Sequence, residues 1–473
     1  MTFAQEGCTL YDVSEMIQKI LNWLIILLPL ALPLYVVRFS VGPLPTTFLE
    51  IYVLVLTVVW FLSKVKSDQG SVTDKSPGSK IPVPSSHIRG SLLEIRSSIG
   101  KWLWPLVTWL AVTLVAVFVA QDSLAAFGHW RAFMLEPVLV FVILLDTLAG
   151  RPHGVALTVR LLRSMAIVTI LMGVYAIFQY ITGWGIPSPW DVAEARRATG
   201  TFGYPNGLSL FIVPFGIVSF IRFVGLLIVD HMGSTLQRYV FAIASALALV
   251  ATVLAKSMGG VLAFGIGVVL TLIIFKKTRI VGIVLTVFGV LAAGLVAWNI
   301  YGTELHPATI EDSLTASKKW SSSVRIIIWQ ESFEIIKDNP VLGTGLRSFK
   351  TAILPYHTAT WMETFPHPHN ILLMLWIETG ILGLLTFLWL IGTWAQTVIR
   401  RRSIVLGPGS DQRQDHVPRT MDRLIWIVPL IVILAHGMVD MPYFKNDLAL
   451  QFFLLAALAT TLSRNPELGS GSN

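Results

Sequence analysis

The stretch TFPHPHNILLMLWIETG, residues Thr364 to Gly380, passes from two histidines between prolines into an apolar run that continues to about residue 399. An apolar helix of roughly 20 residues is long enough to cross a hydrocarbon core about 30 Å thick. Runs of this kind recur along the whole chain. The sequence therefore predicts a polytopic helical membrane protein, with two imidazoles at the end of one span.

Composition leads to the same class. The chain is 54% hydrophobic and 13% charged, about half the charged fraction of a soluble domain. Cys8 is the only cysteine, which excludes a disulfide framework and a thiolate metal cluster. Acidic but no basic residues precede the first apolar run, so we expect no cleavable signal peptide.

Apolar runs bounded by charged residues, glycine or proline predict an all-α fold with about twelve transmembrane helices. The seventh and eighth are separated only by AKSMGG, Ala255 to Gly260. The twelve spans lie near residues 17–37, 47–63, 102–120, 132–149, 157–181, 207–228, 239–255, 258–275, 280–299, 369–399, 424–439 and 447–463.

The distribution of Lys and Arg between loops predicts which ends of these spans face the cytoplasm. With both termini inside, the inner segments together with the inner ends of the spans hold 23 of the 35 Lys and Arg residues. The outer segments hold the other 12, and six of those lie in one long loop with seven acidic residues. Because short cytoplasmic loops are enriched in Lys and Arg, we predict cytoplasmic N and C termini. The net charge of +8 then reflects topology and contact with membrane lipids, and we expect no nucleic-acid partner.

The predicted organisation has five segments. Residues 1–63 hold the first two spans, 101–299 hold spans three to nine, and 369–473 hold the last three spans and a cytoplasmic tail. Residues 64–100 are rich in Ser, Pro and Lys and poor in large apolar residues, which is typical of a disordered linker, here a cytoplasmic one. Residues 300–368 form one large extracytoplasmic loop.

That loop contains a predicted amphipathic helix lying at the outer membrane surface. Ser322 or Ser323 can cap its start, and Asn339-Pro340 ends it. Its apolar face is predicted from residues three and four apart, Ile326, Trp329, Phe333 and Ile336.

Four arginines are predicted on the outer side. Arg325 begins the amphipathic helix and Arg347 follows the glycine turn LGTGL, while Arg196 and Arg197 lie in a second outer loop, residues 185–207. Each could simply be solvated or bind lipid phosphates. Together they suit a diphosphate carried by a lipid. Each guanidinium can bind two phosphate oxygens at once, and it stays charged at all cellular pH values. A nucleotide fits less well, since no glycine-rich phosphate loop or DxD motif lies outside.

The outer histidines leave three alternatives open. His357, His367 and His369 could bind zinc, but catalytic zinc sites need a tighter ligand set, and we expect no metal and no cofactor. HPHN could instead cap the helix that follows, with Asn370 satisfying free helix donors. His369 could orient the substrate or act as a general base, because imidazole titrates near neutral pH.

Two acidic residues and two glycines of the last spans also bear on the site. Glu378 is about two and a half turns beyond His369 on the same predicted helix, so direct coupling between them is doubtful and a structural hydrogen bond is at least as plausible. Asp440, at the outer end of the eleventh span, is better placed to meet an outer arginine. Gly380 and Gly383 are expected to allow close helix packing.

Three stretches resemble the O-antigen ligase and Wzy-type polymerase superfamily of bacterial envelope enzymes. They are RATGTFGYPN from Arg197, RIIIWQESFEIIKDNPVLGTGLRSF from Arg325 and HPHNILLMLWIETGILG from His367. The last matches the family pattern of His and Asn, nine residues, then Gly-x-x-Gly, here His369, Asn370, Gly380 and Gly383. The resemblance implies a GT-C-like membrane fold.

The resemblance also implies an activity. Such enzymes are metal-independent glycosyltransferases that move a glycan from an undecaprenyl-diphosphate carrier to a lipid, glycan or protein acceptor at the outer face of the bacterial cytoplasmic membrane. By this likeness Arg197 and Arg325 bind the diphosphate and His369 lies at the transfer centre. Secondary substrate contacts are expected from Arg347, Asn370, Arg196, Asn206 and Asp440.

Other functions remain as alternatives. A repeat-unit polymerase and a protein O-oligosaccharyltransferase share the same motifs. Twelve spans also suit a transporter or a lipid flippase. Transporters, however, tend to have two related halves with polar sites near the midplane, whereas the polar residues here concentrate in predicted outer loops.

Overall fold

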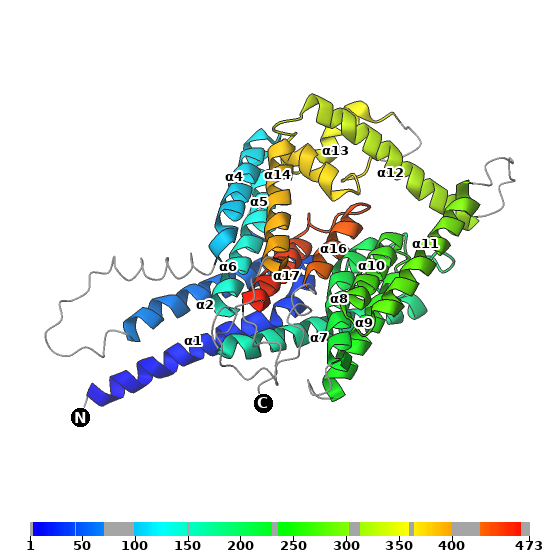
Figure 1. Cartoon of the computed structure of the whole chain (residues 1–473). Coiled ribbons are helices and arrows are strands. Elements are labelled where there is room, and N and C mark those ends of the chain that lie inside the picture. Colours follow the sequence, from blue (N-terminus) through cyan, green and yellow to red (C-terminus); the bar gives the residue numbers. More distant parts are fainter. Residues whose placement is uncertain are drawn as a thin grey trace, which may run out of the picture.

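The computed structural model describes residues 3–42, 44–70, 99–148, 152–228, 235–301, 313–358, 364–399 and 426–464. These residues are mostly helical (Figure 1). The apolar helices among them include α1 (Phe3–Ala31), α2 (Phe48–Gly70), α4 (Leu103–Val119), α6 (Glu136–Leu148), α7 (Pro152–Thr182), α8 (Pro205–Ile228), α9 (Thr235–Leu254), α10 (Met258–Ile274), α11 (Arg279–Tyr301), α14 (Ile371–Ile399), α16 (Ile427–Gly437) and α17 (Asn446–Arg464).

Six of the apolar stretches are long and apolar enough to cross a membrane, which makes the chain polytopic. They are Glu15–Val36, Gly100–Val119, Ala156–Thr182, Pro205–Ile228, Thr235–Leu254 and Ile371–Ile399. The expected break at AKSMGG is confirmed, because α9 ends at Leu254 and α10 begins at Met258.

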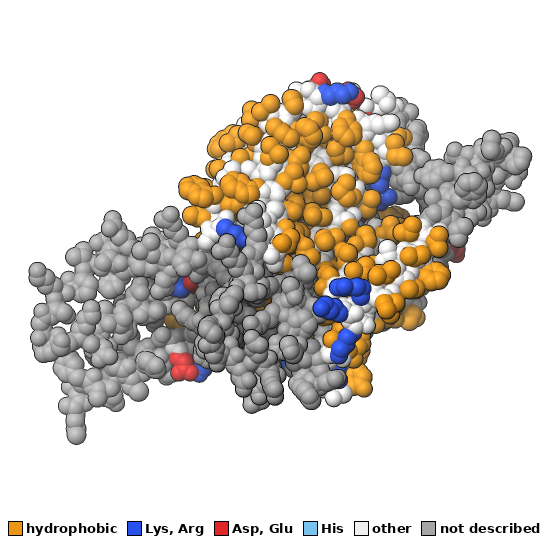
Figure 2. Space-filling view, viewed as in Figure 1, with side chains coloured by type: hydrophobic (Ala, Val, Ile, Leu, Met, Phe, Trp, Pro, Cys, Tyr) orange, Lys and Arg blue, Asp and Glu red, His pale blue; other side chains and the backbone are white. Residues whose placement is uncertain are grey.

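The centre of the bundle is α17, which packs on α6 and α14 (Figure 1). Its side chains from Leu448 to Ala459 are all buried. A helix that is apolar on every side is stable only when it is surrounded. The outer helices instead expose large apolar side chains, and Figure 2 shows them covering most of the described surface in that view. This distribution suits lipid as the outer solvent.

The N-terminal region differs from the all-α prediction by a short β-hairpin. Strands β1 (Arg38–Val41) and β2 (Leu44–Thr47) pair in antiparallel register between α1 and α2. The hairpin is tied to the bundle through Glu50, whose carboxylate accepts hydrogen bonds from Thr46, Asn446 and Arg131.

The predicted linker also begins later than expected. Helix α2 continues to Gly70, so residues 64–70 are helical, and Lys64 forms an ion pair with Asp146 at 2.8 Å. Residues 71–98 of the predicted linker, like residues 465–473 of the predicted tail, lie outside the described residues.

The amphipathic helix of the large loop is α12 (Ser313–Asp338), which crosses above the other helices in Figure 1. It begins more than two turns before Ser322, so the predicted cap was wrong and Arg325 lies inside the helix, away from its free N–H groups. Its end before Asn339-Pro340 is confirmed.

The apolar face predicted for α12 is also corrected. Its protein side consists of Val324, Ile328, Ile335 and Ile336. By contrast, Ile326 and Phe333 are 52% and 51% exposed. The helix therefore has two apolar sides, of which one packs on the protein and the other is open.

After α12, the segment Pro340–Leu346 lies against a break in α14. Gly380 adopts φ 67° and ψ −176° inside that helix. The interrupted helical hydrogen bonds are replaced by Thr344 N–H to the Ile377 carbonyl (2.7 Å) and Ile381 N–H to the Pro340 carbonyl (3.1 Å). We expected close helix packing at Gly380, but here the glycine admits a loop.

The same segment reaches α4 as well. The Leu346 N–H donates to the Ala116 carbonyl at 3.1 Å, and a Cβ on Gly345 would lie 2.4 Å from Ala120. Two short helices follow, α13 (Phe349–Ala352) and η4 (Leu354–Tyr356). The loop after α12 is thus built into the helix bundle at both α4 and α14.

Candidate active site

A chain of polar contacts connects three of the sequence motifs. Nη2 of Arg197 donates to Oδ1 of Asn206 at 3.1 Å, and Nδ2 of Asn206 donates to Oδ2 of Asp440 at 2.7 Å. The other carboxylate oxygen of Asp440 lies 3.7 Å from Nδ1 of His369. The structure therefore brings together four predicted site residues from the loop before α8, the start of α8, the segment after α16 and the start of α14.

Arg197 is held by the end of α9. Its backbone N–H bonds to the Trp190 carbonyl, and its Nε donates to the Ala255 carbonyl at 2.9 Å. The guanidinium also lies 4.9 Å from the ring centre of Trp190. These contacts use Nε and Nη2, while Nη1 makes no hydrogen bond to a described residue. One edge of the guanidinium is thus fixed and the other remains available to an anion.

Arg325 approaches this cluster from α12. It interacts electrostatically with Arg197 and with His436, which is 3% exposed at the end of α16. One turn further along α12, Nε1 of Trp329 donates to the Pro368 carbonyl at 2.9 Å, which fixes the helix over the histidine segment. Burial lowers the pKa of Arg197; Asp440 opposes this effect and the like charge of Arg325 adds to it. Two cations that interact through their charges favour an anion bound to both.

His369 has an unusual backbone for a residue with a side chain. Its φ is +52°, in the left-handed region that few non-glycine residues adopt. The Asp440 carboxylate beside it also accepts the Met441 N–H at 2.9 Å. Burial alone would raise the pKa of Asp440, but contact with His369 and the nearby His436 and His367 hold that pKa well below its usual range. Asp440 is therefore an anion at Nδ1 of His369, which leaves Nε2 for substrate.

His367 is a neighbour of His369, with their rings edge to face and their centres 4.4 Å apart. Burial lowers the pKa of His367 to about 4, and the neighbouring His369 adds to this effect, so His367 is neutral at physiological pH. His357 lies elsewhere, with Nδ1 3.1 Å from a carboxylate oxygen of Glu331. The three histidines are thus not gathered, and no group of three possible metal ligands occurs within the described ranges.

Asn370 caps the start of α14. Helix capping by HPHN was one of the alternatives that the sequence left open. Its Oδ1 accepts the Leu372 and Leu373 N–H groups at 3.0 and 3.1 Å, and its Nδ2 donates to the Met438 carbonyl at 3.2 Å. These bonds join the starts of the His369 and Asp440 segments. Asn370 therefore positions the site, and its amide is not directed at a ligand.

We expect Asn370→Ala to destabilise the protein by about 1 kcal/mol, because the helix loses its side-chain cap. Thermal unfolding of the purified protein measures the loss. Asn370→Ser keeps a hydroxyl acceptor for the two amides and should recover most of it. Equal unfolding temperatures for the alanine variant and the wild type would contradict the capping role.

Arg196 is turned away from the cluster. Its Nη1 donates to the Tyr180 and Ile181 carbonyls at 3.0 and 3.1 Å, which satisfies the last carbonyls of α7. The predicted substrate contact of Arg196 gains no support from this geometry. His436, in contrast, was missed, although it precedes Asp440 by four residues in HGMVDMPYF and spacing at one helical turn could have indicated it.

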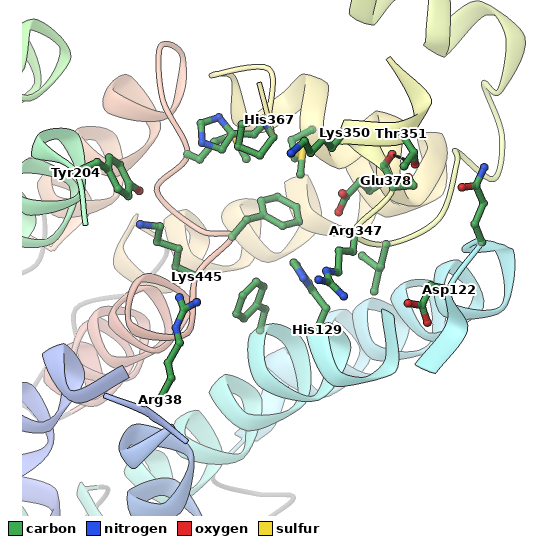
Figure 3. A pocket seen from close by; sticks show the side chains of 18 residues that line it. Arg38, Asp122, His129, Tyr204, Arg347, Lys350, Thr351, His367, Glu378 and Lys445 are labelled. Atoms are coloured by element: carbon green, nitrogen blue, oxygen red, sulfur yellow. Dashed lines mark hydrogen bonds between the residues drawn. The ribbon is translucent and has the colours of Figure 1, made fainter. Parts of the chain in front are cut away.

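Next to the cluster lies a cavity of about 640 Å³ (Figure 3). Arg347, a predicted site residue, lines it together with Arg38, Lys350, Lys445 and His367. Neither Arg197, Arg325 nor His369 lines the cavity. Arg347 therefore belongs to a second group of cations, separate from the first two arginines.

Glu378 also lines the cavity and is fully buried. Its carboxylate lies beside the backbone amides of residues 347–349, at the start of α13. We expected no direct coupling between Glu378 and His369, and this placement agrees with that expectation. The Glu378 carboxylate lies beside the loop after α12 and not beside a neighbouring helix.

Comparison with known proteins shows which family this chain resembles. Residues 243–388 match a family model described as O-antigen ligase. A Rickettsia conorii protein provisionally named a polysaccharide ligase is 29% identical over 148 residues, which cover 29% of this chain and 34% of that protein. A Rickettsia felis protein of the same provisional name is 28% identical over 107 residues, 21% of this chain and 26% of the relative. The matches thus span about a third or less of these relatives, and the resemblance to the O-antigen ligase and Wzy superfamily is confirmed.

Proposed function

We propose that this chain, as a member of the O-antigen ligase and Wzy superfamily, is a glycosyltransferase that moves a glycan from an undecaprenyl-diphosphate carrier to an acceptor hydroxyl. The acceptor is a lipid, a glycan or a protein. The chain spans the bacterial cytoplasmic membrane about twelve times in a GT-C-like fold, with both termini inside and the active site outside. Its domains are the five segments predicted from the sequence, with the linker beginning after Gly70, where α2 ends.

The observation that carries the proposal is the contact chain Arg197–Asn206–Asp440–His369, with Arg325 beside it. Glycosyl transfer from a diphosphate needs cations at the leaving group and a proton acceptor near the attacking hydroxyl. Both lie within one cluster assembled from five segments of the chain. Transporters usually hold their substrate near the bilayer midplane, whereas this cluster lies at the ends of α8, α14 and α16 and in the adjoining loops.

In the proposed step, the acceptor oxygen attacks the anomeric carbon of the donor's first sugar with inversion. The bond between that carbon and the diphosphate oxygen breaks, and the diphosphate leaves with the electron pair. Arg197 and Arg325 stabilise the charge that gathers on it. Nε2 of His369 takes the acceptor proton, and Asp440 stabilises the resulting imidazolium through Nδ1. An anion at Nδ1 favours the role of base over that of diphosphate contact.

We prefer the ligase activity over the polymerase activity, because the family description and the names of both relatives contain the word ligase. The two activities differ in product. Deletion of a polymerase removes only the long glycans, whereas deletion of a ligase leaves acceptor without glycan while carrier-linked polymer persists. Gel analysis of glycan length in a deletion strain therefore separates them.

The purified protein with a lipid-linked oligosaccharide tests the reaction itself. We expect Arg197→Gln and Arg325→Gln each to lower kcat by about 10²–10³-fold, the usual effect of removing one donor to the developing charge. Arg279→Gln is the matched control, because Arg279 is exposed and bonds to the Ile273 carbonyl far from the cluster. Released undecaprenyl diphosphate is measured in detergent. Activity that requires a sealed vesicle would indicate a transporter, and near-normal kcat in both variants would contradict the arginine assignment.

A further inference from the structure

We propose that the cavity beside His367 binds an anionic group, phosphate or carboxylate, on the acceptor. This rests on the proposed function, because it assumes that the donor diphosphate occupies Arg197 and Arg325. The acceptor would then be an acidic or phosphorylated glycan, and the cavity would select it.

The cavity gathers cations from three separate regions of the chain. Arg38 comes from β1, Arg347 and Lys350 from the loop and helix after α12, and Lys445 from the segment before α17 (Figure 3). Two acidic residues line it as well. Asp122 caps α5 (Ser123–Trp130) through the Ala125 N–H at 3.0 Å, and Glu378 is fully buried beside backbone amides. The cations therefore exceed the anions, and the exposed ones, Arg38, Arg347 and Lys350, face no carboxylate at ion-pair distance within the described residues.

Two of these cations are held by the fold. Nζ of Lys445 lies 3.7 Å from the ring centre of Tyr204, and burial lowers the pKa of Lys445 to about 8 while Asp447 and Asp440 oppose the shift. Arg347 adopts φ +63° between the docked glycine turn and α13. Non-glycine residues in this region are uncommon and often occur at ligand sites. Lys445 is thus partly desolvated, and a desolvated cation attracts an anion more strongly than a solvated one.

The position of the cavity fits a second substrate. His367 lines it, and the His367 ring contacts that of His369. Met441, next to Asp440, lines it too. A group held here therefore lies one side chain away from the proposed base, and neither diphosphate arginine lines the cavity. Its volume of about 640 Å³ is within the range of about 300–1,000 Å³ typical of small-ligand sites, large enough for a charged sugar.

Binding to the full-length protein in nanodiscs is the first test, with glucose 6-phosphate, glucuronic acid and glucose as probes. We expect both charged sugars, or one of them, to bind at least tenfold more tightly than glucose. The stronger of the two identifies phosphate or carboxylate as the ligand group. The double variant Arg347→Gln/Lys350→Gln should weaken charged probes about tenfold or more and leave glucose unchanged, because each charge-assisted hydrogen bond contributes to affinity.

Two further variants control for damage to the loop. Arg38→Gln removes a cation from the hairpin and should also weaken charged probes severalfold. Lys337→Gln removes an exposed lysine of α12 that pairs with Glu334, and it should have no effect. Equal binding of charged and neutral sugars, or a preference that survives in both cavity variants, would overturn the proposal. Displacement of the probes by undecaprenyl diphosphate would overturn it too, because the cavity would then hold the donor.

The transfer reaction separates this inference from the proposed function. With matched acceptors that carry or lack a phosphate, the double variant should raise KM about tenfold for the phosphorylated acceptor only. If transfer proceeds and both acceptors respond alike, the cavity assignment fails while the function stands. If the wild-type protein transfers no glycan to any acceptor, the proposed function fails, and the acceptor assignment fails with it.

Discussion

His369→Ala is expected to lower the rate of glycan transfer by about 10²–10⁴-fold, the usual contribution of a positioned general base. The side chain lies at the end of the contact chain from Arg197, with Asp440 at Nδ1 and Nε2 free for the acceptor. The measurement is single-turnover transfer by purified protein, with donor binding determined separately. Unchanged donor affinity with a lost rate would identify His369 as a base.

His357→Gln is the matched control for this variant. His357 lies in the same loop but is paired with Glu331, to which glutamine can still donate. Near-normal transfer by His357→Gln and loss by His369→Ala would separate the site from a general effect on the loop. If His369→Ala loses donor affinity instead of rate, the histidine contacts the diphosphate, and the assignment as base is wrong.

Asp440→Asn tests the other member of the His369–Asp440 pair. It keeps the shape of the side chain but removes the charge that stabilises the imidazolium, so transfer should fall by a smaller factor than in His369→Ala. A positioning residue should also change the pH profile of kcat, which loss of packing alone would not do. A rate and a pH profile equal to those of the wild type would remove Asp440 from the mechanism.

Gly380→Ala is expected to have the largest effect on stability. A Cβ at Gly380 would lie 1.9 Å from the Val341 carbonyl oxygen, and φ of 67° disfavours any side chain there. Left-handed strain and forced displacement of backbone each cost about 1–3 kcal/mol. The loop from Pro340 to Leu346 would have to leave the break in α14, and this loop connects α12, which holds Arg325, to Arg347. We expect both a lower unfolding temperature and loss of transfer.

Gly392→Ala provides the control on the same helix. A Cβ at Gly392 has nothing within 4 Å, and alanine favours a helix over glycine by about 1 kcal/mol. This variant should be as stable as the wild type or slightly more so. Thermal unfolding followed by tryptophan fluorescence compares the two. Similar unfolding temperatures for both variants would contradict the docking of the loop at Gly380.

Several features of the fold were predictable from local sequence. Apolar runs near 20 residues must form helices in lipid, because backbone N–H and C=O groups find no other partners there. Proline after Asn339 ends α12 for an equally local reason. The start of α12 was missed because SLTASKKWSS, residues 313–322, has no apolar periodicity but favours helix well enough to extend it.

Some site residues could also be predicted individually, from residue type and from the three family motifs. Arg197, Arg325 and His369 are predicted site residues that the structure gathers into one cluster. Arg196 shows the limit of this reasoning, because it is adjacent to Arg197 and yet caps α7. Residue type does not distinguish these neighbours. The family motif begins at Arg197, and the direction of the Arg196 side chain, which bonds to the end of α7, agrees with that boundary.

The sequence by itself determined the membrane class, the positions of most spans and the chemistry available to the loops, since these follow from hydropathy and residue type over a few turns. Only the tertiary structure decided which polar groups meet. Asn206 and Asp440 bond across 234 residues, and the Arg347 cavity lies apart from Arg197. Lipid gives apolar helices no hydrophobic preference for one neighbour over another. Their arrangement therefore depends on shape, on breaks such as that at Gly380 and on polar contacts that no local pattern records.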